Sequence, residues 1–126
     1  MAETNWEICV QTRAVGEAAI IYASDYLNKL TGERIERECK RQLDSGRRAV
    51  IINFRDTELV NSIGVSILLE LIDAAEQNTA QLIFSDVNAN TANLFETLGL
   101  TRLVSLATDE AEALSWVSAP VSEARP

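Results

Sequence analysis

Two short, almost continuous apolar runs predict the centre of a β-sheet. They occupy residues 49–52 and 81–84. A strand with one face in water alternates apolar and polar residues, so these two runs are expected to be covered on both faces. Nearer the N-terminus, residues 6–11 alternate and residues 18–22 are mostly apolar. Because Gly16-Glu17 lies between these two segments, they are predicted to pair as a hairpin.

The spacing of apolar residues changes to a helical period between these runs. Residues 31–43 predict an amphipathic helix that ends at Gly46, and a second helix is predicted over residues 62–77. The apolar positions of the first helix recur at every fourth residue: Ile35, Cys39 and Leu43. The inward stripe expected for the second helix is Ile63, Ile67, Leu71 and Ala74.

The last third of the chain predicts two more helices and one strand. Asn88 is placed to cap a third helix that Gly99 ends, and residues 103–106 predict a short strand at a sheet edge. The inward residues expected for this helix are Thr91, Leu94, Phe95 and Leu98. A fourth helix is predicted from Thr108, whose hydroxyl would cap it, to about Trp116.

The order of these elements predicts an α/β fold with a single mixed β-sheet. An N-terminal antiparallel hairpin precedes parallel strands, which four helices connect by right-handed crossovers, mostly on one face of the sheet. We expect one domain over residues 1–117. Both prolines follow the last helix, so residues 118–126 are expected to form a flexible C-terminal tail.

Composition narrows the classes of function. The 126 residues carry a net charge of −8, which opposes nucleic acid and anionic lipid surfaces as partners. Histidine is absent, which argues against a catalytic triad or a metal site, so we expect no enzyme, no catalytic or metal-binding residues and no cofactor. Cys9 and Cys39 read as small buried residues. No segment predicts membrane insertion or a secretion signal, so we expect a cytoplasmic protein.

The run Asn61-Ser62-Ile63-Gly64 opens the second predicted helix. Unpaired backbone N–H groups and the positive end of the helix dipole gather there. The Ser62 hydroxyl could simply cap the helix, or it could accept a phosphate that the dipole would stabilise. Gly64 costs about 1 kcal/mol relative to alanine within a helix, which indicates close approach by a neighbouring strand or by a partner.

Two motifs resemble the STAS domain of bacterial anti-sigma-factor antagonists, and the likeness extends over residues 6–116. In that family a strand and a short loop lead to Asp-Ser-(Ser/Thr)-Gly-(apolar)-Gly at the start of the second helix, where this chain has residues 61–66. A later Leu-(Phe/Leu)-x-x-x-Gly-Leu-x-x-(apolar) segment is also typical, and residues 94–103 are similar to it.

The resemblance implies a regulatory module that binds an anti-sigma factor. Such a partner is often a serine kinase with a histidine-kinase-like ATPase fold, and it phosphorylates the serine that corresponds to Ser62. The resemblance therefore implies a partner-binding surface centred on Ser62. The residues expected to form it are Asn28, Thr57, Glu58, Asn61, Ser62, Ile63, Gly64 and Ser66.

The chain departs from the family pattern at several of these positions. Asn61 replaces the aspartate that precedes the serine in the family motif, and Ser66 replaces the second glycine. Asn28 and Asn53 also occupy positions where aspartate is usual. Loss of these charges would make the functional end less negative and leaves phosphorylation of Ser62 an open question. Two alternatives therefore stay open: an accessory subunit of a lipid-transport ABC system, and a sensor of nucleotides or other small molecules. The sequence leaves the oligomeric state open.

Overall fold

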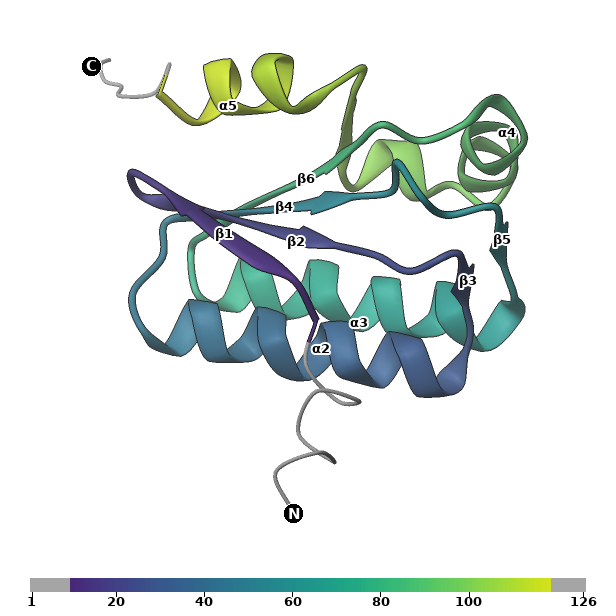
Figure 1. Cartoon of the computed structure of the whole chain (residues 1–126), viewed down its shortest axis with the longest axis horizontal. Coiled ribbons are helices and arrows are strands. Elements are labelled where there is room, and N and C mark those ends of the chain that lie inside the picture. The colour runs from purple at the N-terminus through teal and green to yellow at the C-terminus, as the bar shows by residue number, and fades with distance from the viewer. Residues whose placement is uncertain (1–9, 119–126) are drawn as a thin grey trace.

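The chain forms a five-stranded mixed sheet with helices on both faces (Figure 1). The structure, a computed structural model, describes residues 10–118. Strand β1 is antiparallel to β2, and β2, β4, β6 and β7 are parallel in that order. The strand bounds are β1 Thr12–Val15, β2 Ala18–Tyr22, β4 Ala49–Asn53, β6 Gln81–Ser85 and β7 Ser105–Ala107. The predicted fold class is confirmed.

The N-terminal hairpin forms, but its first strand begins later than residues 6–11. The two residues Gly16 and Glu17 make the turn, so Val15 pairs with Ala18 and the strand must be the segment directly before the turn. Gly16 has a φ of 58°, the left-handed conformation that such tight hairpin turns require. Residues 6–9 of the predicted strand lie outside the described part of the chain.

Helices α2 and α3 cover one face of the sheet and α5 covers the other (Figure 1). The helices are α2 Lys29–Asp44, α3 Ser62–Gln77, α4 Ala89–Thr97 and α5 Glu110–Ser118, with a 3-10 turn η1 at Leu100–Arg102. The prediction that the helices lie mostly on one face holds for α2 and α3, and α5 is the exception. Helix α5 extends to Ser118, and residues 119–126 of the predicted tail lie outside the described part of the chain.

The sheet is buried on both faces, as its apolar runs predict. Ile21, Ile52 and Phe84 point into the core beneath α2 and α3. Their chain neighbours Ile20, Ile51 and Ile83 point the other way, into a smaller core completed by Ala113 of α5. Cys39 is a buried free thiol of α2 in the larger core.

The ends of α2 and α4 follow the predicted residues, but the start of α5 does not. Gly46 and Gly99 follow helices with φ values of 96° and 86°, and Asn88 caps α4. The prediction that the Thr108 hydroxyl caps α5 is wrong. The Asp109 carboxylate accepts the Glu112 N–H at 2.9 Å instead, while the Thr108 hydroxyl donates to the Glu112 side chain. An aspartate one residue nearer the helix fits the cap position better.

A second, two-stranded sheet was not predicted. Strands β3 (Tyr26–Leu27) and β5 (Leu59–Val60) pair in parallel at the end of the molecule where α2 and α3 begin (Figure 1). We call this end the tip. Leu98, predicted to face inward, is 51% exposed as the C-cap residue of α4, and Leu103, predicted to begin a strand, is 59% exposed and precedes β7, which begins at Ser105.

No helix between residues 10 and 118 is long and apolar enough to span a bilayer.

Candidate functional site

Helix α3 begins at Ser62, whose side chain is exposed. Of the two roles considered for the Ser62 hydroxyl, the helix cap is taken by another residue, because the Asn61 side chain accepts the Gly64 N–H at 2.8 Å. Asparagine is among the best N-cap residues, and Asn61 has the extended backbone that the cap position needs. Ser62 is exposed, and within residues 10–118 its hydroxyl has no hydrogen-bond partner. The side chain is therefore open to modification.

The backbone around Ser62 favours negative charge. The N–H groups of Ser62 and Ile63 belong to the first turn of α3 and have no acceptor within the helix. Helix α2 begins at the same tip, so the positive ends of two helix dipoles lie close together (Figure 1). A phosphate on Ser62 would meet free N–H donors and a favourable dipole.

Asn28 closes the start of α2 instead of presenting a free side chain. Its Oδ1 accepts the Thr31 N–H at 3.1 Å, and the Thr31 hydroxyl accepts the Asn28 N–H at 3.0 Å. This reciprocal pair is a capping box, which fixes the first turn of α2. The two asparagines of the tip, Asn28 and Asn61, therefore both act as helix caps.

Gly64 is the point at which α3 touches β3. A Cβ atom built on Gly64 would lie 2.6 Å from the backbone oxygen of Leu27, closer than real carbon contacts allow. The same oxygen accepts the Asn61 N–H at 3.0 Å. Gly64 is buried, so its role is to let the start of α3 seat against β3, as the helix penalty of glycine indicated.

Four exposed apolar side chains surround this start, and we call them the tip patch. They are Tyr26, Leu30, Leu59 and Ile63, with exposed fractions of 42%, 58%, 63% and 47%. Tyr26 and Leu59 are direct partners in the β3–β5 pair. The prediction that Ile63 packs inward is wrong, because the neighbouring Gly64 and Val65 take the buried positions of this turn. Single exposed apolar residues are common, but several at one place indicate an interaction surface.

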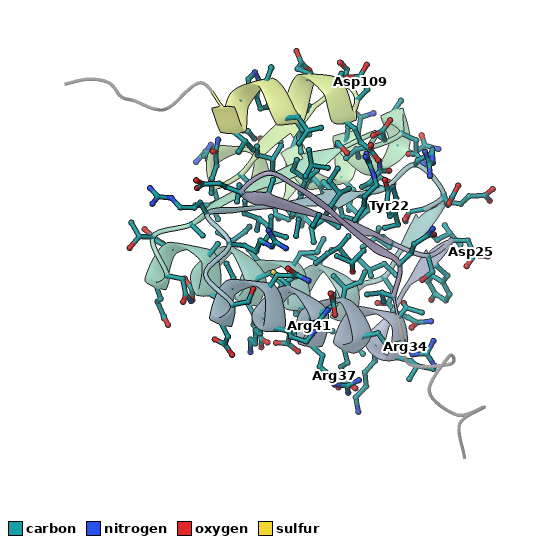
Figure 2. The ribbon with its side chains drawn as sticks, turned by 60° about the vertical axis from the view of Figure 1, so that its left-hand side comes forward. Tyr22, Asp25, Arg34, Arg37, Arg41 and Asp109 are labelled. Atoms are coloured by element: carbon teal, nitrogen blue, oxygen red, sulfur yellow. The ribbon has the colours of Figure 1, made fainter. Side chains whose placement is uncertain are left out.

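The loop between β4 and α3 is held in place by Thr57. Its side chain is 3% exposed, and its hydroxyl donates to the Ser24 carbonyl at 2.7 Å. Thr57 therefore positions the loop and presents little surface to a partner. The adjacent Glu58 side chain is exposed, while the Glu58 N–H donates to the Asp25 carbonyl at 2.7 Å. Figure 2 shows Asp25 at this edge of the molecule. Ser66 lies one turn after Ser62 and is exposed.

Asn53, the third substituted aspartate position, is not part of the tip surface. It is buried at the end of β4, on the sheet face that α5 covers. Its Nδ2 donates to Asp86 at 3.0 Å and to Glu110 at 2.8 Å, and its Oδ1 accepts the Arg55 N–H. Figure 2 shows the neighbouring Tyr22 on the sheet below the start of α5. The amide thus joins the sheet to the first residue of α5.

Glu110 is the charged centre of this network. Burial alone would raise the pKa of its carboxyl group, but hydrogen bonds from Tyr22, Arg13 and Asn53 outweigh burial and lower the pKa below its ordinary value. The Arg13 Nη2 atom lies 2.6 Å from the Glu110 Oε1 atom. The network anchors α5 at neutral pH and lies apart from Ser62.

Comparison with known proteins agrees with this geometry. The STAS domain family model matches residues 10–113, and the chain belongs to that family. No curated protein sequence matches the chain significantly.

Solved structures share the fold at low sequence identity. An anti-sigma factor antagonist from Mycobacterium paratuberculosis is 16% identical with a TM-score of 0.76, over 86% of this chain and 92% of that one. The anti-sigma factor antagonist SpoIIAA in its unphosphorylated form is 22% identical with a TM-score of 0.73, over 87% and 96%. SpoIIAA of Bacillus in its phosphorylated form is 22% identical with a TM-score of 0.68, over 86% of this chain and 99% of that one. A sulfate transporter family protein from Wolinella succinogenes is 14% identical with a TM-score of 0.67, over 84% and 88%.

Proposed function

We propose that this STAS domain is a regulatory module that docks through its tip on an anti-sigma factor or a related kinase-like ATPase, and that phosphorylation of Ser62 releases it. One observation carries the proposal: an exposed serine hydroxyl at the start of α3, with no hydrogen-bond partner among the described residues, stands next to four exposed apolar side chains. The role proposed is one of binding and not of catalysis, and it places the protein in the cytoplasm.

The physical basis of the switch is a difference between the free and the bound state. A phosphate adds a charge of about −1.5 to −2, and in the free protein the helix start and water both stabilise it. In a complex that covers the tip patch, the same group would be buried without a matching cation and would lose its hydration. Phosphorylation would therefore weaken the complex while leaving the fold intact. A solved relative with both phosphorylated and unphosphorylated forms supports this reading.

The amides at the tip bear on how this switch works. Asn28 and Asn61 both cap helices, a role that aspartate would fill equally well. The fold therefore does not require an amide at either position. Their neutral side chains leave less negative charge around Ser62 than aspartates would. The tip is therefore less negative than it would be with aspartates, and a phosphate on Ser62 would add its charge of about −1.5 to −2 there.

Matched aspartate variants test the proposal. The anti-sigma factor kinase that copurifies with the tagged chain is titrated against wild type, Ser62→Asp and Gln77→Asp. Ser62→Asp is expected to weaken binding by at least about tenfold, which corresponds to about 1.4 kcal/mol. Gln77→Asp adds the same charge at the other end of α3, on an exposed residue away from the tip, and is expected to change affinity by less than about threefold.

Direct mapping of phosphate completes the test. Incubation with the same kinase and ATP, followed by mass spectrometry, is expected to place phosphate on Ser62 and to find none in Ser62→Ala. Phosphate at another residue, or equal affinity of the two aspartate variants, would contradict the switch. Copurification with a transporter ATPase and no phosphorylation would favour the lipid-transport alternative.

A further inference from the structure

One side chain, Asn88, bonds both to α4 and to the loop that leads to Ser62. Its Oδ1 accepts the Thr91 N–H at 2.8 Å, which caps α4. Its Nδ2 donates to the Thr57 carbonyl at 3.1 Å. The two bonds use the two ends of one planar amide, so α4 and the loop are held at a fixed distance from each other.

The loop depends on bonds from two sides. On one side, the Thr57 hydroxyl donates to Ser24, and the N–H groups of Glu58 and Leu59 donate to Asp25 at 2.7 and 3.1 Å. These bonds attach the loop to the segment that precedes β3. On the other side, the Asn88 amide attaches it to α4. Leu59 of the tip patch follows Thr57 by two residues, and Ser62 follows Thr57 by five, so the position of this loop sets the shape of the tip.

We propose that Asn88 is a positioning residue of the tip, which couples the start of α4 to the surface around Ser62. The coupling is a property of the chain alone, and only its effect on partner binding rests on the proposed function. Coupling of this kind is reciprocal: a partner that orders the loop also protects the first turn of α4, and a change at α4 loosens the loop.

Two substitutions separate the two roles of the amide. Asn88→Asp keeps an oxygen for the cap but removes the N–H donor to Thr57. Asn88→Ser also keeps a capping oxygen and adds no charge. Asn90→Asp is the control, because Asn90 is exposed in the same first turn of α4 and makes no hydrogen bond through its side chain within residues 10–118.

Amide hydrogen exchange on the protein alone is the measurement. In Asn88→Asp and Asn88→Ser, exchange at Glu58 and Leu59 is expected to accelerate about fivefold, the effect of one lost hydrogen bond. Exchange at Thr91 is expected to stay within about twofold of wild type, since the cap remains. Asn90→Asp is expected to leave both regions unchanged. Unchanged loop exchange in both Asn88 variants would overturn the proposal, and so would an equal acceleration throughout β4 and α3.

A pH series tests the hydrogen bond to Thr57 directly, because a general loss of stability would not show the same pH dependence. A protonated aspartic acid regains an O–H that can donate to Thr57. The excess loop exchange of Asn88→Asp over wild type is therefore expected to disappear as the pH falls below about 4, near the ordinary pKa of aspartate. The excess in Asn88→Ser is expected to persist. An excess in Asn88→Asp that does not change with pH would overturn the assignment of this bond.

Partner titration then connects the coupling to docking. With the kinase used above, Asn88→Ser is expected to weaken binding about threefold to tenfold. Loosened loop exchange with unchanged affinity would overturn the role of Asn88 at the docking surface while leaving the switch at Ser62 intact. If loop exchange is faster in the Asn88 variants but Ser62→Asp binds the kinase as tightly as wild type, the switch at Ser62 would be overturned and the coupling through Asn88 would remain.

Discussion

Two buried helical glycines offer a sharp test of what holds the tip together. Alanine at Gly64 would place a Cβ atom 2.6 Å from the backbone oxygen of Leu27. Alanine at Gly32 of α2 would place one 2.7 Å from the Cδ1 atom of Ile67. The two contacts are almost equally short, but the first meets backbone and the second meets the flexible end of a side chain.

The expected costs differ for that reason. At Gly64 the strand or the helix must shift, which costs about 1–3 kcal/mol for overpacking, against a gain of at most about 1 kcal/mol in helix propensity. We expect Gly64→Ala to destabilise the fold by about 1–2 kcal/mol. At Gly32 a change of the Ile67 rotamer costs about 0.5–1.5 kcal/mol and the propensity gain offsets it, so Gly32→Ala is expected to stay within about 0.5 kcal/mol of wild type.

Urea denaturation followed by circular dichroism measures both variants. With a slope near 2 kcal/mol per molar urea, Gly64→Ala is expected to lower the midpoint by about 0.5–1 M at an unchanged slope. Gly32→Ala is expected to move the midpoint by less than about 0.3 M. Equal costs at the two positions, or a neutral Gly64→Ala, would refute the reasoning that backbone contact at Leu27 limits this site.

Two further predictions concern titratable groups. The folded pKa of Glu110 is below the ordinary 4.5, so its contribution to stability is present at neutral pH and is lost as the pH falls through the folded pKa. Glu110→Gln is expected to be about 1 kcal/mol less stable at pH 7, and this difference is expected to shrink as acid protonates the wild-type carboxylate. A constant difference from pH 7 to pH 3 would argue against the charge as its source. Burial raises the pKa of the Cys39 thiol to about 12, so in a Cys9→Ser background a thiol reagent at pH 8 is expected to label Cys39 only on unfolding. Rapid labelling of the folded protein would contradict the buried position of this residue.

The long elements could be predicted from sequence because periodicity and burial agree in them. Helix α3 has the predicted bounds, and β4 and β6 are buried runs within one residue of the prediction. Strands β3 and β5 could not be predicted, because two residues are too few to show a period. The position of α5 on the second face of the sheet could not be predicted either. This helix follows the last strand and connects to no further strand, so the handedness of crossovers does not determine its side.

Sequence predicted the start of α3, where the candidate site lies, but not most of the exposed apolar side chains around it. The run around Ser62 carries local signals, since a capping residue and an unusual helical glycine both occur within it. The choice of Asn61 over Ser62 as the cap depends on where the helix starts, which sequence fixes only to within a few residues. The tip patch combines side chains from α2, α3, β3 and β5, and no local pattern brings such residues together.

The parallel strands lie in the sheet in the order in which they occur along the chain, and this has a consequence for folding during synthesis. Strands β2, β4, β6 and β7 are added to the sheet in the order in which they are synthesised, and each new strand pairs with the one made before it. A nascent chain can thus extend its sheet edge by edge without waiting for distant segments. Ile20, Ile51 and Ile83 stay uncovered until α5 docks, so an intermediate with a complete sheet but no α5 would expose an apolar surface.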